Sequence, residues 1–574
     1  MVYGQKINLK FTDTIRGLLA SSGGTEIQLD KFHPNTKSVI PNEEWVCEIH
    51  KQFKSFFVVK PLYKVGDEPV VVQLVTDKPK YKPSKYQQAV IDFVKNGKGN
   101  AVINAVAGSG KSTTLNMILE SINPSKSVLM VAFNKDIVAE LKEKNSHITN
   151  AEITTWHSFG YQALRYGFQS KIEKNKYVDI AKTIIESHDF ENENIDRYEY
   201  MKRCVKLCEL ARLNLAKSSK EIEKLAEINL IDITETEHQQ AFQMIEIGKK
   251  NLKIIDFTDM IYLPVIHNVK LKHADFVLSD ESQDQNACQY ELLKRTVRPY
   301  GGRFIAVGDP KQAIYLFAGS STDSFHRLLD IPNTVELPLS VCYRCDKTIV
   351  NYAKSLVPNI EYRENAEDGI LEMEAKLEDI MESDMILCRN TLPLVKLCYQ
   401  FLKKGIKAFV QGSDMIEGLV ALIEKQKEHN ILDVIAKLEK ELENIIKTLT
   451  RKKGYTREEA IEQPLYENLL EKIEIIRVLS DGCGNDTNCV IENMRKIFDE
   501  NSIGIKLSTI HRSKGLENDR VFLIQPRMLP SPRSKRSAEL LRQEYNLKYV
   551  AITRAKHYFG IINEDQFDAY KKEK

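Results

Sequence analysis

The chain has 574 residues, of which 42% are hydrophobic and 28% charged, and its formal net charge at pH 7 is +2. This composition is typical of a globular protein of several domains. The small net charge excludes a general polycation, so any groove for nucleic acid must be local. No apolar run is long enough to span a membrane, and the opening MVYGQKINLKF lacks the apolar core of a signal peptide. We therefore expect a cytoplasmic protein with no membrane partner.

Residues 1–77 are predicted to form a β-rich accessory domain, with a small barrel as one form that it could take. The segment EEWVCEIHKQFKSFFVVKPLYK mixes β-branched and aromatic residues with basic ones, in runs that partly alternate. Such strands can stack the bases of a single strand, or the domain can merely pack on its neighbour. A polar, proline-containing linker, TDKPKYKPSK, follows.

The stretch NAVAGSGKSTTL, residues 104–115, predicts a phosphate-binding loop between a strand and a helix. Gly108 and Gly110 permit tight turns that aim several N–H groups at one anion, which the start of the next helix, near residue 113, also favours. Lys111 supplies a charge for the outer phosphates, and Ser112 a hydroxyl for magnesium. Ala105 stands where the usual motif has its first glycine, and a glycine-rich turn with a chance lysine is the alternative.

Alternating strand and helix patterns then predict a parallel α/β sheet. Strands are expected at SVLMVAF, ADFVLSDESQD and RFIAVGDPKQ, the last two ending in polar residues where open α/β sheets bind ligands. Residues from about 160 to 250 are helical by periodicity and rich in charge, as an inserted helical domain would be. A second α/β pattern begins near Thr334, with strands at DMILCRN, KAFVQGSD and RVFLIQP.

A helix with a narrow apolar seam is predicted inside the second α/β region. Apolar residues alternate spacings of three and four at Ile435, Leu438, Leu442, Ile445 and Leu449. A self-packed helical hairpin is favoured over a coiled coil with a partner.

The ten cysteines are scattered, which favours a reduced protein over zinc knuckles or a disulfide framework. Cys342 and Cys345 form a single CxxC, and Cys483 and Cys489 flank the loop CGNDTNC. Free thiols are the expectation at both pairs, and a zinc or redox site is the alternative.

Acidic and polar residues after the predicted strands outline an ATP site. Asp280 and Glu281 follow an apolar strand, so one carboxylate could hold magnesium while the other takes a proton from water. Alone, such a pair is usually a solvated turn, but the phosphate loop favours the functional interpretation. Gln312 could sense the γ-phosphate or orient water, while Tyr315 and Phe317 are aromatics on a loop.

Further candidates lie nearer the C-terminus. Tyr343 could stack on adenine, and Arg344 could grip phosphate. The stretches STIHRSKGLENDRVF and YVAITRAKH add Arg512, Lys514 and Arg554, each of which, taken alone, is more often a surface residue.

Taken together, these motifs resemble those of the superfamily 1 DNA helicases of the UvrD/Rep/PcrA type. In order they are YQQAV, AVAGSGKST, VAFNKDI, TTWHSFG, IDFTDMI, SDESQD, VGDPKQAIYLFAG, CYRCDK, STIHRSKGLE and VAITRAK. HRSKGLE and VAITRAK are very specific to that group, and the resemblance covers residues 84–563. VAFNK and GDPKQAIY are closer to the F-box helicase branch.

The resemblance implies an α/β fold of two RecA-like parallel-sheet motor domains with helical insertions, beside the small β-rich N-terminal domain. The first motor domain (1A) would comprise residues 78–159 and 251–333, with the helical insertion 1B at 160–250. The second (2A) would comprise residues 334–413 and 503–574. Its helical insertion 2B, residues 414–502, is shorter than the usual counterpart.

For ATP and Mg²⁺, the resemblance implies a set of residues by position. Catalysis would rest on Lys111, the general base Glu281, the γ-phosphate sensor Gln312 and two arginine fingers from the second motor domain, Arg344 and Arg554. Magnesium would be held by Ser112 and Asp280. The ATP-binding residues would be Gln87, which reads adenine, Ala107, Gly108, Ser109, Gly110, Lys111, Ser112, Thr113, Tyr343, which stacks on adenine, and Glu517, which contacts the ribose.

The resemblance also implies single-stranded and partial-duplex DNA as partners, with a protein partner of the N-terminal domain or the 414–502 insertion as a further option. The implied DNA contacts are Phe133, Asn134, His157, Phe159, Tyr315, Phe317, Arg389, Thr509, His511, Arg512 and Lys514.

The implied activity is that of an ATP-dependent DNA helicase that moves 3′→5′ on single-stranded DNA and unwinds duplex. It would serve DNA replication, repair or recombination, near the nucleoid or, for a viral protein, in the host cytoplasm. Ala318 replaces an arginine of the family motif, and this, with the short 414–502 insertion, supports an alternative. That alternative is a DNA-stimulated ATPase switch that remodels protein–DNA complexes or senses DNA without separating strands. An RNA-directed motor and a metabolic P-loop kinase are further alternatives.

Overall fold

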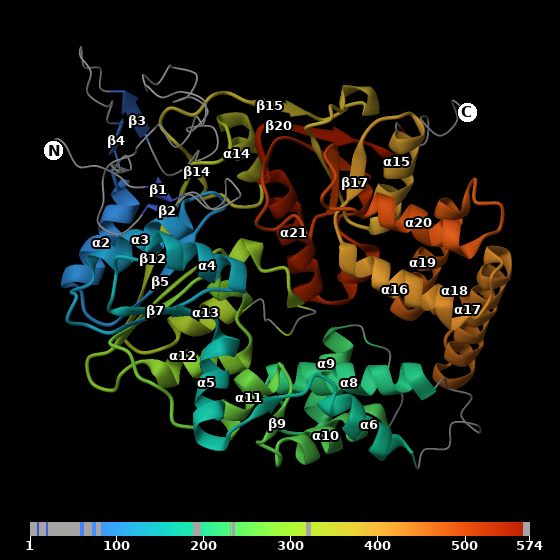
Figure 1. Cartoon of the computed structure of the whole chain (residues 1–574), viewed down its shortest axis with the longest axis horizontal. Helices are drawn as coiled ribbons and strands as arrows, with labels where there is room; N and C mark the ends of the chain where they lie inside the picture. Colours follow the sequence, from blue (N-terminus) through green and yellow to red (C-terminus); the bar gives the residue numbers. More distant parts are fainter. Residues whose placement is uncertain are drawn as a thin grey trace. The chain divides into compact units, whose positions relative to one another are not determined.

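The computed structural model describes the strands at residues 9–10, 19–20, 58–61 and 72–75, and then residues 82–186, 197–229, 231, 233, 236–316, 319 and 323–565 (Figure 1). The chain divides into two compact units, residues 1–84 and 85–574. In the first unit, two antiparallel pairs form: β1 (Leu9–Lys10) with β2 (Leu19–Ala20), and β3 (Val58–Pro61) with β4 (Val72–Val75). These strands agree with the β-rich prediction, while the predicted barrel lies outside the described residues.

The first sheet of the larger unit is six-stranded and entirely parallel. Its strand order is β12-β5-β11-β10-β6-β7. Every residue of β6 and β11 is buried, as expected for the inner strands of a parallel sheet covered on both faces. The strands are β5 (Asn100–Ala105), β6 (Val128–Val131), β7 (Ala151–Thr154), β10 (Phe276–Ser279), β11 (Arg303–Gly308) and β12 (Thr334–Leu339).

Helices follow these strands, and short polar side chains fix where several of them begin. The hydroxyl of Thr155 accepts a hydrogen bond from the backbone of Ser158 at the start of α5, and Asn286 forms a capping box with Gln289 at the start of α12. The helices are α2 (Lys85–Asn96), α3 (Lys111–Ser121), α4 (Lys135–Lys144), α5 (Trp156–Phe168), α11 (Asp259–Ile266), α12 (Ala287–Thr296) and α13 (Ser324–Leu329).

The strand at residues 334–339 was expected to open the second motor domain, and this placement is wrong. β12 pairs in parallel with β5, from Thr334 opposite Asn100 to Leu339 opposite Ala105, and so completes the first sheet. It lies at the edge of that sheet, where Pro338 is tolerated because an edge strand leaves one row of N–H groups without a ladder partner. The chain therefore crosses to the second sheet only after Leu339.

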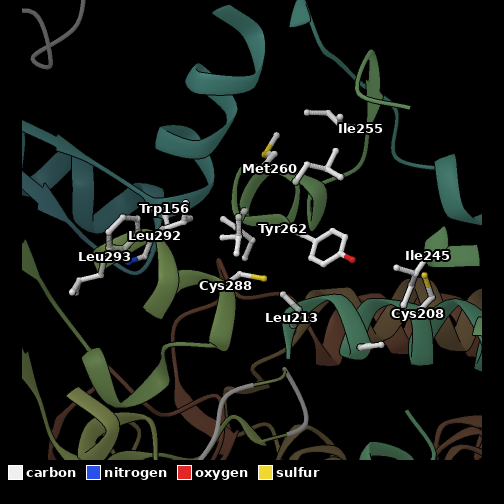
Figure 2. Packing of buried hydrophobic residues seen from close by; sticks show 14 of the residues in the cluster. Trp156, Cys208, Leu213, Ile245, Ile255, Met260, Tyr262, Cys288, Leu292 and Leu293 are labelled. Atoms are coloured by element: carbon white, nitrogen blue, oxygen red, sulfur yellow. The ribbon is translucent and has the colours of Figure 1, made fainter. Parts of the chain in front are cut away.

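The first helical insertion shares one core with the first motor domain. Figure 2 shows Tyr262 of α11 directed toward the insertion helices that carry Cys208, Leu213 and Ile245, and all belong to one buried cluster with Trp156 of α5. The insertion consists of α6 (Lys176–Ile185), α8 (Arg197–Leu213), α9 (Ser219–Ile228) and α10 (Glu237–Gly248), with the parallel ribbon of β8 (Lys171–Ile172) and β9 (Ile254–Ile255). The predicted helical character of residues 160–250 is confirmed where the structure describes them, at 160–186, 197–229 and 236–250.

A buried ionic network joins the insertion to α11. Arg212 of α8, which is 1% exposed, pairs with Asp256 at 2.7 Å and with Asp259 at 2.9 Å. Lys176 of α6 also reaches Asp259, at 2.6 Å, and the Tyr177 ring lies 3.5 Å from the Arg212 guanidinium carbon. Each buried charge therefore has a partner, which is the condition for tolerating charge in a core.

The second sheet is also six-stranded and parallel, in the order β15-β20-β19-β16-β18-β17. A short parallel pair, β13 (Val341–Cys342) with β14 (Glu361–Tyr362), precedes it along the chain. The strands are β15 (Ile370–Glu372), β16 (Met385–Cys388), β17 (Ala408–Val410), β18 (Ile505–Thr509), β19 (Asn518–Ile524) and β20 (Ala555–Ile562), and the main helices are α14 (Lys347–Ala353), α15 (Thr391–Lys403) and α21 (Ala538–Ile552). Two parallel-sheet domains with helical insertions are thus present, as predicted.

The second insertion packs on itself and on the second sheet. Its helices are α16 (Ser413–Lys425), α17 (Ile431–Lys453), α18 (Arg457–Ile461), α19 (Pro464–Ser480) and α20 (Thr487–Ile497). The predicted seam lies on α17, where Ile435, Leu438 and Leu442 are buried in one cluster with Ile473 and Ile476 of α19. The favoured helical hairpin is therefore confirmed. No helix in the described ranges is long and apolar enough to cross a membrane.

The expectation of free thiols is wrong for one cysteine pair and confirmed for the other. Cys483 and Cys489 form a disulfide, with their Cα atoms 5.5 Å apart. Gly484 and Asn485 both adopt positive φ between α19 and α20, and this turn brings the two cysteines within bonding range. Cys342 and Cys345 are free.

Replacing Arg212 with alanine should destabilise the first motor domain and its helical insertion by about 3–5 kcal/mol, because it leaves buried carboxylates without their counter-charge. Urea unfolding followed by tryptophan fluorescence measures this, since Trp156 lies in the same core. Arg457 is a matched control, because it pairs with Glu443 on an exposed surface. R457A should therefore leave the midpoint of the urea unfolding transition unchanged. Equal midpoints for both variants would contradict the assigned role of the network.

Candidate nucleotide site and nucleic-acid face

The predicted phosphate loop lies between β5 and α3, at the carboxyl edge of the first sheet. Gly108 and Gly110 adopt φ of 69° and 77°, a backbone conformation that favours glycine. α3 begins at Lys111, two residues earlier than predicted. Ala105 remains within the β5 ladder opposite Leu339, and its methyl group is buried, so this position has no need of a glycine.

The loop carries features that suit a bound anion. The Ser109 hydroxyl is buried and makes no hydrogen bond to any described group. Ser112 and Thr113 are exposed at the start of α3, where the helix N-terminus favours negative charge. An unpaired buried hydroxyl costs free energy unless a ligand satisfies it, so the loop fits a phosphate group.

A half-buried ion pair joins the loop to the end of β10. The Lys111 ammonium lies 2.6 Å from the Glu281 carboxylate, directly after β10. Glu281 has a φ of 46°, a left-handed conformation that is uncommon for a residue with a side chain. Local strain of this kind is often found at functional sites.

The acidic residues around this pair have shifted pKa values. Burial, with the Glu281 charge beside it, raises the pKa of Asp280 to about 6. Burial alone would raise the pKa of Glu281, but the ammonium groups of Lys111 and Lys514 lower it to about 2. Burial also raises the pKa of Asp284 and Asp309 to about 6. Hard oxygen donors such as the Asp280 carboxylate and the Ser112 hydroxyl suit a divalent cation such as Mg²⁺.

The predicted adenine contacts flank the loop. Gln87 of α2 is buried, and its amide donates to the Thr114 hydroxyl at 3.1 Å. A Cβ on Gly110 would lie 3.6 Å from that amide nitrogen, so Gln87 adjoins the loop. Tyr343 is 43% exposed, and its backbone N–H donates to the Gly108 carbonyl at 2.8 Å. The structure therefore places both residues beside the loop.

The two predicted arginine fingers belong to the second motor domain. Arg344 pairs with Glu517 at 2.6 Å, and a Cβ on Gly108 would lie 2.7 Å from the Arg344 Cβ. Arg554 is fully buried and donates to the carbonyls of Val550 and Leu516. Burial, with Arg344 nearby, lowers the pKa of Arg554 to about 10. Arg344 thus lies against the loop, while Glu517, the expected ribose contact, here serves as its counter-charge.

One face of α21 forms hydrogen bonds to the backbone of the first motor domain. The amide N–H of Ala107 donates to the Tyr549 hydroxyl at 2.9 Å. Asn546 donates to the Ala313 carbonyl at 2.9 Å, and Gln543 accepts from the Leu316 N–H at 3.1 Å. We call Gln543, Asn546 and Tyr549 the α21 polar face. No motif predicted these contacts, although polar residues spaced by three just before VAITRAK were a usable signal.

Lys514 was predicted to contact DNA, but it lies in the contact between the motor domains. Its ammonium is 2.5 Å from the Asp284 carboxylate and 2.8 Å from the Gln312 carbonyl. It also lies 4.7 Å from the centre of the Tyr315 ring. Since its side chain is 8% exposed, Lys514 links the acidic cluster to the predicted γ-phosphate sensor instead of facing solvent. Gln312 in turn donates to Asp309 at 2.7 Å.

The remaining predicted DNA contacts of the first motor domain divide into exposed and buried groups. Phe133 is 51% exposed and stacks on Tyr315, with ring centres 5.9 Å apart. Asn134 caps α4 by accepting from the Ile137 backbone. Phe159 packs edge-on against Trp156 at 4% exposure, so it cannot offer its face to a base. Phe317 lies outside the described residues.

Four further candidates, Arg389, Thr509, His511 and Arg512, belong to the second motor domain, and His157 lies on α5 of the first. Two guanidinium nitrogens of Arg389, Nε and Nη2, donate to the Glu544 carboxylate, the shorter distance being 2.8 Å. Burial, with Arg389 beside it, lowers the pKa of His511 to about 3, and burial also lowers the pKa of His157 on α5. Thr509 ends β18, and the Arg512 guanidinium carbon would be 3.1 Å from a Cβ on Gly412.

Two parallel α/β sheets, with a phosphate loop on the first and Arg344 of the second motor domain lying against that loop, define a P-loop protein built of paired RecA-like domains. The chain matches the family models of the UvrD/REP helicase N-terminal domain, at residues 85–330, and of the UvrD-like helicase C-terminal domain, at residues 504–562. It belongs to the UvrD-like helicase family, as predicted.

Several curated relatives are similar to this chain at low identity. A probable DNA helicase II homolog of Mycoplasma pneumoniae is 26% identical over 50% of this chain and 43% of the relative. F-box DNA helicase protein 1 of Schizosaccharomyces pombe is 23% identical over 85% and 58%, and the ATP-dependent DNA helicase PcrA of Staphylococcus aureus is 26% identical over 47% and 39%. The chain therefore spans less than two thirds of each of these relatives.

Replacing Tyr549 with phenylalanine should free the Ala107 amide, because it removes the only acceptor that the described residues offer to that N–H. A buried donor without a partner costs about 1–3 kcal/mol, so hydrogen exchange at the Ala107 amide should accelerate. Tyr545 lies on the same helix and is 48% exposed, so Y545F is the matched control. Equal exchange rates in the two variants would rule out the contact.

Proposed function

We propose that the chain is an ATP-driven DNA helicase that uses Mg²⁺, translocates 3′→5′ on single-stranded DNA and separates duplex ahead of it. The observation that carries this proposal is the half-buried Lys111–Glu281 pair at a phosphate loop, with Arg344 of the second motor domain lying against that loop. Family membership and the names of the relatives support it. The direction of movement rests on the resemblance alone.

The ion pair suggests how hydrolysis is limited to the ATP-bound protein. With its pKa near 2, Glu281 is a poor general base while Lys111 is its counter-ion. When Lys111 turns toward the phosphates, Glu281 loses that charge partner and its basicity rises. Glu281 can then take the proton of the attacking water, while Gln312 orients that water. Magnesium, held by Asp280 and Ser112, would neutralise charge on the phosphates.

Contacts between the motor domains would convert hydrolysis into movement. Arg344 and Arg554 would hold the γ-phosphate, so its loss removes a charge contact between the two sheets and lets the cleft open. The same opening would break the hydrogen bonds of the α21 polar face. Lys514 joins Asp284 to the Gln312 loop and lies over Tyr315, so a change at the phosphate reaches the exposed Phe133–Tyr315 stack. Exposed aromatic rings bind successive bases by stacking.

A second function, ATP-driven remodelling without strand separation, is favoured by the packing of the 414–502 insertion. Leu419, Leu438 and Ile476 of this insertion share one buried cluster with Ile386 and Val410 of the second sheet. An insertion fused to its motor domain in this way moves with it. A strand-displacement assay on tailed duplexes separates the two functions, because a remodeller would hydrolyse ATP on DNA and release no strand.

ATP turnover with and without single-stranded DNA, at stated salt, tests the proposal. We expect strong stimulation by DNA, a fall in turnover of 100-fold or more in K111A, and retained nucleotide binding with slow turnover in E281Q. Retained turnover in K111A would overturn the site assignment. ATP turnover that neither DNA nor RNA stimulates would contradict the proposal that the chain is a translocating motor. Preferential stimulation by RNA would show that it moves on RNA instead of DNA. Unwinding of a 5′-tailed but not of a 3′-tailed duplex would reverse the direction.

A further inference from the structure

Two free thiols bracket the residues that face the phosphate loop. Cys342 ends β13, and Cys345 follows one turn later, so Tyr343 and Arg344 lie between them. Both cysteines are buried, at 0% and 1% exposure. Neither takes part in the hydrolysis proposed above, so this CxxC still lacks an assigned role.

The turn brings the two cysteines together. The backbone N–H of Cys345 donates to the Cys342 sulfur at 3.4 Å, and the Cys345 sulfur lies 3.8 Å from the Thr553 carbonyl oxygen. Arg344 donates to that same carbonyl at 3.1 Å. Cys345 and Arg344 therefore contact the same carbonyl, that of Thr553, which directly precedes Arg554.

The two thiols differ in acidity. A hydrogen bond from the Cys345 thiol, with backbone N–H groups and the Arg344 charge, lowers the pKa of Cys342 to about 7 despite burial. The same hydrogen bond and burial raise the pKa of Cys345. An acidic thiol beside a second, less acidic one is the usual arrangement for thiol–disulfide exchange. Burial raises the pKa of the Cys388 and Cys398 thiols to about 12, so these are far less reactive.

The phosphate loop covers this pair. A Cβ on Gly108 would lie 2.9 Å from the Cys342 sulfur, so the loop closes over the thiol from the opposite motor domain. Opening of the cleft, which the proposed function requires, would separate Gly108 from residues 342–344 and expose Cys342 to solvent. The thiol would then be accessible in one state of the motor and shielded in the other.

We propose that Cys342 and Cys345 form a redox-active dithiol that reacts with small disulfides and switches off the ATP site. The Cys342 thiolate attacks the disulfide RSSR, the S–S bond breaks, and one RS⁻ leaves. Cys345 then loses its proton to solvent and attacks the Cys342 sulfur, forming the Cys342–Cys345 bond and releasing the second RS⁻. Two electrons pass from the cysteines to the small disulfide.

Closing this disulfide would reshape the turn. Bonded sulfur atoms lie about 2.05 Å apart, so the two cysteine side chains must move toward each other, and each now contacts a neighbour, Cys342 at Gly108 and Cys345 at the Thr553 carbonyl. Tyr343 and Arg344, which lie inside the closed ring, would move with them. The predicted loss of ATP turnover rests on the proposed function, whereas formation of the disulfide does not.

The test uses the full chain in glutathione buffers of increasing oxidised fraction. We expect a peptide linked through Cys342 and Cys345 by mass spectrometry, and a tenfold or greater fall in ATP turnover that dithiothreitol reverses. C345S should stop at a mixed disulfide between Cys342 and glutathione. C342S/C345S should show the same turnover in oxidising and reducing buffer, while the control C483S/C489S should still lose turnover on oxidation.

Two results would overturn the proposal. One is the absence of the linked peptide at every glutathione ratio. The other is an equal loss of turnover in C342S/C345S, which would place the sensitive thiols elsewhere. A chain without ATP turnover in any buffer would overturn the proposed function instead, and the linked peptide would still decide whether the dithiol forms.

Discussion

Charge neutralisation at the Lys111–Glu281 pair is the constraint on which the rest of the nucleotide site depends. Four carboxylates crowd the carboxyl edge of the first sheet: Asp280, Asp284 and Asp309, which are buried, and Glu281, which is half-buried. Like charges in so small a volume are tolerated only with counter-charges close by. Lys111 is one, at 2.6 Å from Glu281, and Lys514 from the second motor domain is the other, at 2.5 Å from Asp284. The acidic cluster is thus one reason why the two sheets stay together.

This arrangement makes the site sensitive to what enters it. A polyanion with a divalent cation changes the local charge balance, so it can redistribute both lysines among new partners. Since one lysine belongs to each motor domain, any such redistribution alters the contact between them. The exposed stack of Phe133 on Tyr315 lies at the end of the same chain of contacts, beside Lys514. Electrostatics at the phosphate loop and the surface offered to bases are therefore parts of one connected structure.

The sequence predicted the architecture and the loop well because both depend on local patterns. Apolar runs before polar residues identified β5, β6, β10 and β11, and the motif series identified the family. Side-chain partners were less predictable, since they depend on which residues the fold brings together from distant positions. Lys514 and Phe159 are residue types that often contact DNA. In this structure, however, Lys514 forms an ion pair with Asp284, and Phe159 packs in the core against Trp156.

Two predictions are wrong and one set of contacts was missed, each for an equally specific reason. The local pattern of β12 is that of the first strand of a new domain, whereas its actual partner, β5, lies far away in the sequence and cannot be found from that pattern. The bond between Cys483 and Cys489 depends on two positive-φ residues that a spacing rule does not consider. The α21 polar face was missed because a helix with polar residues every third position resembles an ordinary solvated surface.

The α21 polar face also bears on how the two halves of such a chain can diverge. Gln543, Asn546 and Tyr549 bond to the amides and carbonyls of Leu316, Ala313 and Ala107, not to their side chains. Every amino acid offers the same carbonyl, and every one except proline offers the same N–H. The side chains of these loops can therefore drift while the interface persists, provided that loop length is kept and proline is avoided. The second motor domain thus recognises the backbone shape of the first motor domain. The two domains can therefore accumulate side-chain substitutions independently of each other.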